Sequence, residues 1–126
     1  MGAKNRFVTP DTVRIELSDG DWIEIKERLT YGEQQRLAGG ALTRVRGAGD
    51  NAAIDLDFER YTLLRMLTWL VDWSFVGANG KPVRVSMSSI AALDPDTAAE
   101  IDAAITAHIE ALGAAKNPLP SPGSDT

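Results

Sequence analysis

The chain has 126 residues and no cysteine, with 18 acidic against 13 basic side chains and a net charge of −5. This length predicts one domain that can bury a hydrophobic core of its own. The absence of cysteine excludes a disulfide framework, a cysteine-based zinc site and a thiol nucleophile. The acidic balance argues against nucleic-acid binding, which requires clustered Lys and Arg, and it favours protein partners.

No targeting or membrane segment is expected. The first residues lack the apolar stretch of a secretory signal, and the longest apolar run, at 66–71, is too short to span a bilayer. A chain without cysteine is compatible with a reducing compartment. We therefore expect a cytosolic protein that does not bind membranes.

Residues 12–26 predict a β-hairpin, because apolar and polar side chains alternate on both sides of a Ser-Asp-Gly turn. A two-residue loop would mix the two faces of the hairpin. A three-residue loop, with Gly20 in the left-handed conformation, sets Ile15 opposite Ile23 and keeps the apolar side chains on one face. We therefore predict the three-residue loop.

A first helix is predicted from Thr30, where the spacing to Glu33 matches a capping box. Its apolar row continues to Val45. The Gly-Gly pair at 39–40 costs roughly 1 kcal/mol per glycine relative to alanine. The helix is therefore weak at this pair, or another part of the chain passes close by. Residues 47–52 are expected to form a flexible loop.

The most apolar segment predicts a helix from about Asp57 to Trp73. Only a narrow stripe of this helix is polar, so it is either central in its domain or covered by a partner. The later elements, in chain order, are a short extended piece at 83–85, a helical turn capped by Ser86 or Ser88, and a last helix that Asp94 caps and Gly113 ends.

The predicted fold class is α+β, with the N-terminal hairpin packed on a small bundle of about three helices. Residues 1–11 are expected to form an arm and 12–113 a single domain. The Pro/Gly/Ser-rich residues 114–126 predict a disordered tail, because they have too little apolar mass to offset the entropy lost on ordering.

No combination of residues in the sequence predicts catalysis, a metal site or a cofactor. The single histidine, His108, falls in an apolar helical stripe and is read as a packed or interface residue. Asp55, Asp57 and Glu59 are read as charge near the start of a helix, since they lack the spacing of a calcium loop. We therefore expect a protein that is not an enzyme.

Aromatic side chains are the candidate contacts with a partner, because tryptophan and tyrosine are enriched at interface hot spots. For Trp69 and Trp73 the alternative is core packing, which their apolar surroundings favour; for Trp22 the two readings are even. The candidate partner-binding residues are Trp22, Tyr61, Trp69, Trp73 and Phe75.

Four short motifs carry a resemblance to a known family: Ser-Asp-Gly-Asp-Trp at 18–22, Leu-Val-Asp-Trp-Ser at 70–74, Gly-Lys-Pro-Val at 80–83 and Leu-Asp-Pro-Asp-Thr at 93–97. With the order of elements over residues 6–112, the chain resembles the tail assembly chaperones of long-tailed bacteriophages. The resemblance implies a non-enzymatic protein of the host cytoplasm. It also implies binding to the tape measure protein while tail tube protein polymerises around it.

Two other functions remain open at this stage. The first is a structural virion component, such as a tail tube, terminator or head–tail joining protein, which would be present in finished particles. The second is a small regulatory or antitoxin-like module, which a co-purified partner would reveal. Assembly into a homo-oligomer is left open by the sequence.

Overall fold

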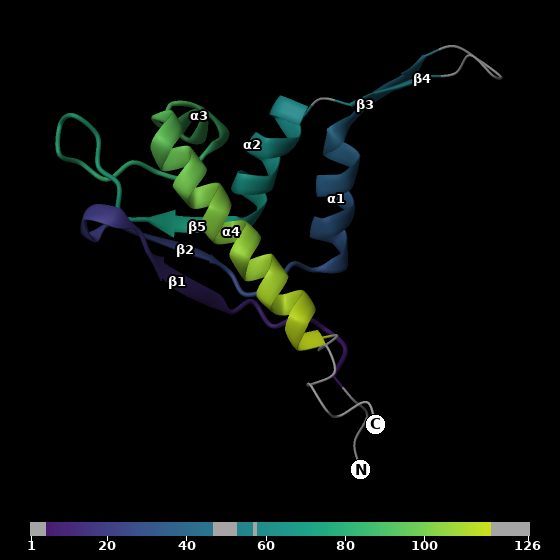
Figure 1. Ribbon diagram of the computed structural model, residues 1–126, viewed down its shortest axis with the longest axis horizontal. Helices are drawn as coiled ribbons and strands as arrows, with labels where there is room; N and C mark the ends of the chain where they lie inside the picture. The colour runs from purple at the N-terminus through teal and green to yellow at the C-terminus, as the bar shows by residue number, and fades with distance from the viewer. Residues whose placement is uncertain (1–4, 47–52, 57, 117–126) are drawn as a thin grey trace, which may run out of the picture.

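The computed structural model describes residues 5–46, 53–56 and 58–116, and within these it places side chains at 5–40 and 59–115. The described part is a mixed α+β fold, which confirms the predicted fold class. A three-stranded antiparallel sheet lies against helices, and a two-stranded hairpin extends away from them (Figure 1).

The sheet contains β1 (Thr12–Glu16), β2 (Trp22–Lys26) and β5 (Leu70–Trp73), in the order β1-β2-β5. The β1–β2 register is the predicted one, with Ile15 opposite Ile23. The three-residue loop is also confirmed as the short 3-10 turn η1 (Ser18–Gly20). Gly20 has φ +80°, the left-handed conformation that glycine adopts at little cost, and Asp19 also has a positive φ of 58°.

The helices are α1 (Tyr31–Ala41), α2 (Phe58–Trp69), α3 (Met87–Ala91) and α4 (Pro95–Lys116). In Figure 1, α4 crosses one face of the sheet, while α1 and α2 lie side by side, above the sheet in this view. The hairpin of β3 (Leu42–Arg46) and β4 (Ala53–Leu56) extends from the far end of α1.

The predicted caps are present at three helix starts. Thr30 Oγ1 accepts from the N–H of Glu33 at 3.1 Å, and a Glu33 carboxylate oxygen accepts from the N–H of Thr30 at 2.9 Å, which completes the capping box of α1. Ser86, rather than Ser88, caps α3. Asp94 caps α4 by accepting from the N–H of Thr97 at 3.0 Å.

The prediction that one helix runs to Trp73 is wrong, because α2 ends at Trp69 and β5 follows without a loop. β5 pairs with β2, and the register shifts where Val71 is left over as an extra residue. This bulge lets Leu70 and Trp73, three residues apart, both face the core. Spacing by three resembles a helical pattern, which is why the sequence predicted a longer helix.

The first helix also ends earlier than predicted. α1 stops at Ala41, and residues up to Val45 belong to β3, where pairing with β4 satisfies their backbone groups. The two glycines at 39–40 make continuation of the helix weak, so a strand pair can replace it. The predicted loop at 47–52 lies outside the described residues.

Three smaller predictions are also wrong. Gly113 does not end the last helix: α4 continues through Lys116, since the residues after Gly113 are good helix formers. The extended piece predicted at 83–85 is not a strand; the isolated bridge in this part of the chain pairs Val76 with Pro82, just before it. The predicted disordered tail is also wrong at its start, because residues 114–116 belong to α4. The remaining ends of the predicted arm and tail, 1–4 and 117–126, lie outside the described residues.

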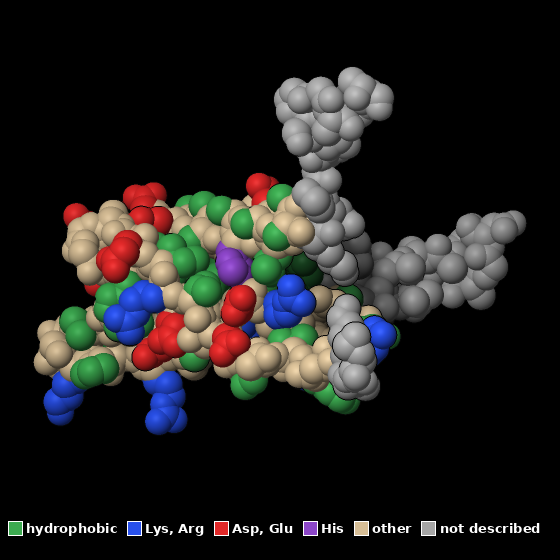
Figure 2. Space-filling model, turned by 90° about the horizontal axis from the view of Figure 1, so that it is seen from below, with side chains coloured by type: hydrophobic (Ala, Val, Ile, Leu, Met, Phe, Trp, Pro, Cys, Tyr) green, Lys and Arg blue, Asp and Glu red, His purple; other side chains and the backbone are tan. Residues whose placement is uncertain are grey.

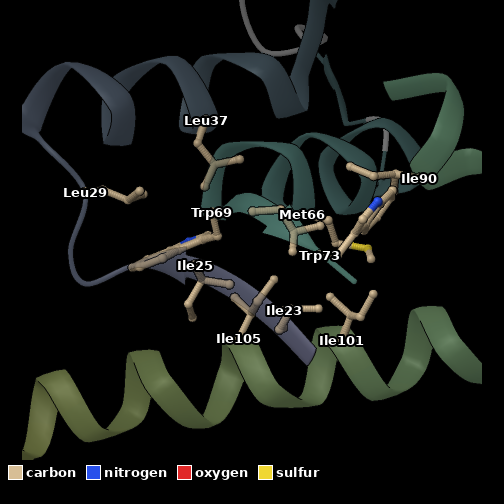
Figure 3. Packing of buried hydrophobic residues seen from close by; sticks show 11 residues of the cluster. Ile23, Ile25, Leu29, Leu37, Met66, Trp69, Trp73, Ile90, Ile101 and Ile105 are labelled. Atoms are coloured by element: carbon tan, nitrogen blue, oxygen red, sulfur yellow. The ribbon is translucent and has the colours of Figure 1, made fainter. Parts of the chain in front are cut away.

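The core lies between the sheet and α4 and extends to α2, α1 and α3. Ile23 and Ile25 of β2 point toward Ile101 and Ile105 of α4, and all four side chains are fully buried (Figure 3). Each such side chain contributes about 1.5–3 kcal/mol relative to an exposed one. The other buried members are Leu29, Leu37, Met66, Trp69, Leu70, Trp73 and Ile90.

The two helical glycines are predicted to respond oppositely to alanine. A Cβ at Gly40 would lie 2.0 Å from Cδ2 of Leu64 in α2, whereas a Cβ at Gly39 meets nothing within 4 Å. Gly40→Ala should therefore lower the free energy of unfolding by about 1–3 kcal/mol. Gly39→Ala should raise it by up to about 1 kcal/mol. Urea unfolding measures both, and equal effects would contradict the close contact between α1 and α2.

The capping box predicts a dependence of stability on pH. The Lys26 side chain, followed by the N–H of Thr30, donates to Glu33 and holds the pKa of this carboxyl below its ordinary value of 4.5. A depressed pKa means that the stabilisation is complete above 4.5 and is lost as pH falls through the folded-state pKa. The stability difference between wild type and Glu33→Gln should shrink on acidification below pH 4.5 in thermal melts. A stability difference that stays constant with pH would exclude a contribution from the lowered pKa of Glu33.

Candidate functional site

Two of the five candidate partner-binding residues are core residues. Trp69 and Trp73 are each only 5% exposed, which confirms the core-packing alternative. Trp69 packs edge-on against His108, with ring centroids 5.8 Å apart. Trp73 Nε1 donates to the carbonyl oxygen of Val83 at 2.6 Å, and its ring lies 5.0 Å from that of Phe75. Neither tryptophan can therefore be a main contact of a partner, although a small part of the Trp73 ring lines a cavity described below.

The other three candidates, Trp22, Tyr61 and Phe75, are half-buried and lie in different places. Trp22 alternates with the buried Ile23, so its side chain lies on the uncovered face of the sheet. There the guanidinium of Arg14 stacks 3.7 Å from the centroid of the Trp22 ring. Tyr61 packs against the core from α2. The structure therefore does not gather the five aromatic residues into one surface.

Phe75 borders an open cavity of about 500 Å³ at the end of the sheet, between the β5 exit, α3 and the start of α4. Its lining includes residues from all four motifs that carry the family resemblance. We call it the motif cavity. Its lining residues are Asp21, Trp73, Ser74, Phe75, Val76, Gly77, Val83, Ser89, Ala92, Leu93, Asp94 and Thr97.

Hydrogen bonds join the motifs around this cavity. Ser74 Oγ accepts from the N–H of Trp22 at 2.9 Å and donates to a carboxylate oxygen of Asp21, also at 2.9 Å. The indole bond from Trp73 to Val83 joins the second motif to the third. Segments that are 50 or more residues apart in the chain are thus held together by specific donors and acceptors.

The polar side chains of the motif cavity already make hydrogen bonds within the fold. Asp94 accepts from the hydroxyl of Thr97 and from its N–H, and these hydrogen bonds hold the pKa of Asp94 below its ordinary value. Ser89 Oγ donates to the carbonyl oxygen of Arg84 at 2.7 Å. The cavity therefore presents an apolar floor with an acidic rim at Asp21 and Asp94. This arrangement suits binding better than proton transfer.

His108 lies on α4, away from the motif cavity. Its Nε2 is 2.7 Å from the carbonyl oxygen of Glu27, and it is half-buried beside Trp69. Figure 2 shows this histidine at the surface, with acidic and basic side chains close by. These contacts tie α4 to the end of β2, in agreement with the prediction of a packed histidine.

Within the described part of the chain, no three His, Cys, Asp or Glu side chains are placed to hold a metal ion. Nor does any helix there have both the length and the apolar character needed to cross a membrane. Comparison of the chain with protein-family models, with curated proteins and with solved structures gave no match. The motif cavity is therefore chosen as the candidate site from its own geometry.

Sequence reasoning missed the polar part of the site. In the sequence, Asp21 and Ser74 stand only as members of two motifs, and nothing there predicts that they bond to each other. The signal that could have found them is the position of each motif beside a chain reversal or a helix start. Residues at such positions collect at the ends of a small fold.

The three tryptophans should differ in how much each contributes to the free energy of unfolding, according to how deeply each is buried. Trp69→Ala and Trp73→Ala should each lower the free energy of unfolding by about 3–5 kcal/mol, because each leaves a large cavity. Trp22→Ala should cost only about 1 kcal/mol, since it removes a half-exposed ring and one cation–π contact. Denaturant unfolding followed by far-UV circular dichroism measures all three, and similar losses would contradict this ranking.

Proposed function

We propose that this chain is a phage tail assembly chaperone, a non-enzymatic protein that acts in the host cytoplasm. It binds the tape measure protein and assists polymerisation of the tail tube protein around it. The proposal rests on the resemblance carried by the four motifs. The observation that supports it most is that these motifs, separate in the sequence, border a single cavity.

The motif cavity is the proposed contact with the tape measure protein. Its apolar floor of Trp73, Phe75 and Val83 can receive one or two large apolar side chains, and the available volume is about 500 Å³. The carboxylates of Asp21 and Asp94 at the rim would face a basic residue of the client. We therefore propose that the cavity takes an amphipathic segment in which Lys or Arg flanks an apolar anchor.

Val76 and Val71 offer a matched pair of variants to test this contact. Val76 borders the cavity and is 57% exposed, while Val71 lies outside it on β5 and is 44% exposed. A lysine at either position should leave folding intact, because neither side chain is in the core. Val76→Lys should weaken binding of the tape measure protein by about tenfold or more, since it places a positive charge beside the apolar anchor and opposes the basic residue of the client. Val71→Lys should bind like the wild type.

The binding measurement is a pull-down of the tape measure protein from the same genome, followed by titration of the purified pair. Unchanged binding by Val76→Lys would exclude the cavity as the contact. No binding by the wild type would overturn the chaperone proposal. Mass spectrometry of purified particles provides the second readout: a chaperone should be absent from finished virions, whereas a structural virion component would be present.

A further inference from the structure

The two edges of the main sheet differ in how their backbone groups are satisfied. On the β5 edge, the outward N–H of Trp73 donates to the Asp72 carboxylate at 2.9 Å, and the chain beyond it continues into the bridge at Val76. On the β1 edge, no other strand pairs among the described residues. β1 is therefore the edge that can accept another strand.

The register defines which groups of β1 point outward. Leu17 N–H donates to the carbonyl of Asp21, and the carbonyl of Asp11 accepts from the N–H of Glu27. Since hydrogen-bonded pairs alternate along an antiparallel ladder, the N–H and C=O groups of Thr12, Arg14 and Glu16 face away from β2. The next outward N–H, at Ser18, is taken by the carboxylate of Glu100 at 2.7 Å, which ends the open edge there.

The side chains of this edge strand are self-complementary. Residues 13–17 read Val-Arg-Ile-Glu-Leu, so the order of apolar, basic, apolar, acidic and apolar residues is complementary to its own reverse. If two copies pair antiparallel about a two-fold axis through Ile15, each Arg14 lies opposite the Glu16 of the other copy. Each Val13 then lies opposite a Leu17. Opposite charges directly across a strand pair are favourable.

The same register also satisfies the backbone. Arg14 and Glu16 both direct their N–H and C=O groups outward, so each Arg14–Glu16 pair between copies can exchange two hydrogen bonds. The half-buried side chains of Val13, Ile15 and Leu17 would meet the same residues of the second copy on the α4 side. Moving the axis to Arg14 would instead place two Arg14 side chains opposite each other, which is unfavourable.

We propose that this chain forms a two-fold symmetric dimer through its β1 edges, which joins two sheets into one continuous six-stranded sheet. The occupant of the edge is a second copy, because the charge order of the strand matches itself in reverse. Only four backbone hydrogen bonds and a short apolar row form the contact, so the dissociation constant should be micromolar rather than nanomolar. This proposal does not depend on the proposed function.

Charge reversal in trans tests the dimer and its register. Sedimentation equilibrium of the wild type at about 100 μM should show association toward 27.2 kDa, twice the chain mass of 13.6 kDa. Glu16→Arg alone and Arg14→Glu alone each create like-charge pairs and should sediment as monomers. An equimolar mixture of the two variants restores both Arg–Glu pairs and should recover the dimer. Far-UV circular dichroism checks that each variant folds.

A cysteine pair tests the axis directly, because the chain has no cysteine of its own. Ile15→Cys should form a disulfide-linked dimer under mild oxidation, since directly opposite Cα atoms lie within disulfide range. Val13→Cys is the matched control: the two copies of residue 13 would be about 14 Å apart in this register, too far to link.

Three outcomes would overturn the proposal. The first is a wild type that stays monomeric at this concentration, which would leave the edge to a strand from another protein. The second is a folded Glu16→Arg variant that still dimerises. The third is cross-linking by Val13→Cys as readily as by Ile15→Cys, which would place the contact elsewhere.

Discussion

The fold depends on the contact between β2 and α4. Ile23 and Ile25 meet Ile101 and Ile105 with no exposed surface left, and this contact presses the long last helix onto one face of the sheet. Burial of four such side chains contributes about 6–12 kcal/mol, which is comparable to the net free energy of unfolding of a domain. Because α4 covers only one face, the sheet must present a polar second face to solvent. The alternation of strands β1 and β2 provides this face.

The single central strand explains the rest of the architecture. β2 needs a partner on each side, and the chain supplies β1 through a tight turn and β5 through an abrupt change from helix to strand after Trp69. The second partner comes from far along the sequence, which draws α2 and the following loop toward the hairpin turn. The motif cavity forms there, where Ser74 bonds to Asp21 and to the N–H of Trp22. The position of the cavity is thus a consequence of the strand order.

Local features were predictable from the sequence, and features set by distant pairing were not. The hairpin register, the Thr30–Glu33 capping box and the Asp94 cap depend on residues a few positions apart, and all three are as predicted. β5 was missed because its bulge gives Leu70 and Trp73 a helical spacing. β3 was missed because it forms only by pairing with β4, a strand that the sequence did not predict. At the site, the apolar surroundings of Trp69 and Trp73 correctly favoured core packing. That Trp22 lies on the opposite face of the sheet could be seen only once the strand pairing was known.

Some residues that line the motif cavity also stabilise the fold. This double role limits which substitutions the site can accept. Trp73 and Val83 line the motif cavity and also hold its wall together through the indole hydrogen bond. A substitution at either position removes folding energy together with any contact to a client. Positions such as Val76 border the same cavity and are largely exposed, so they can vary without that loss. Specificity for a client can therefore change at the rim, while the floor remains fixed by the needs of the core.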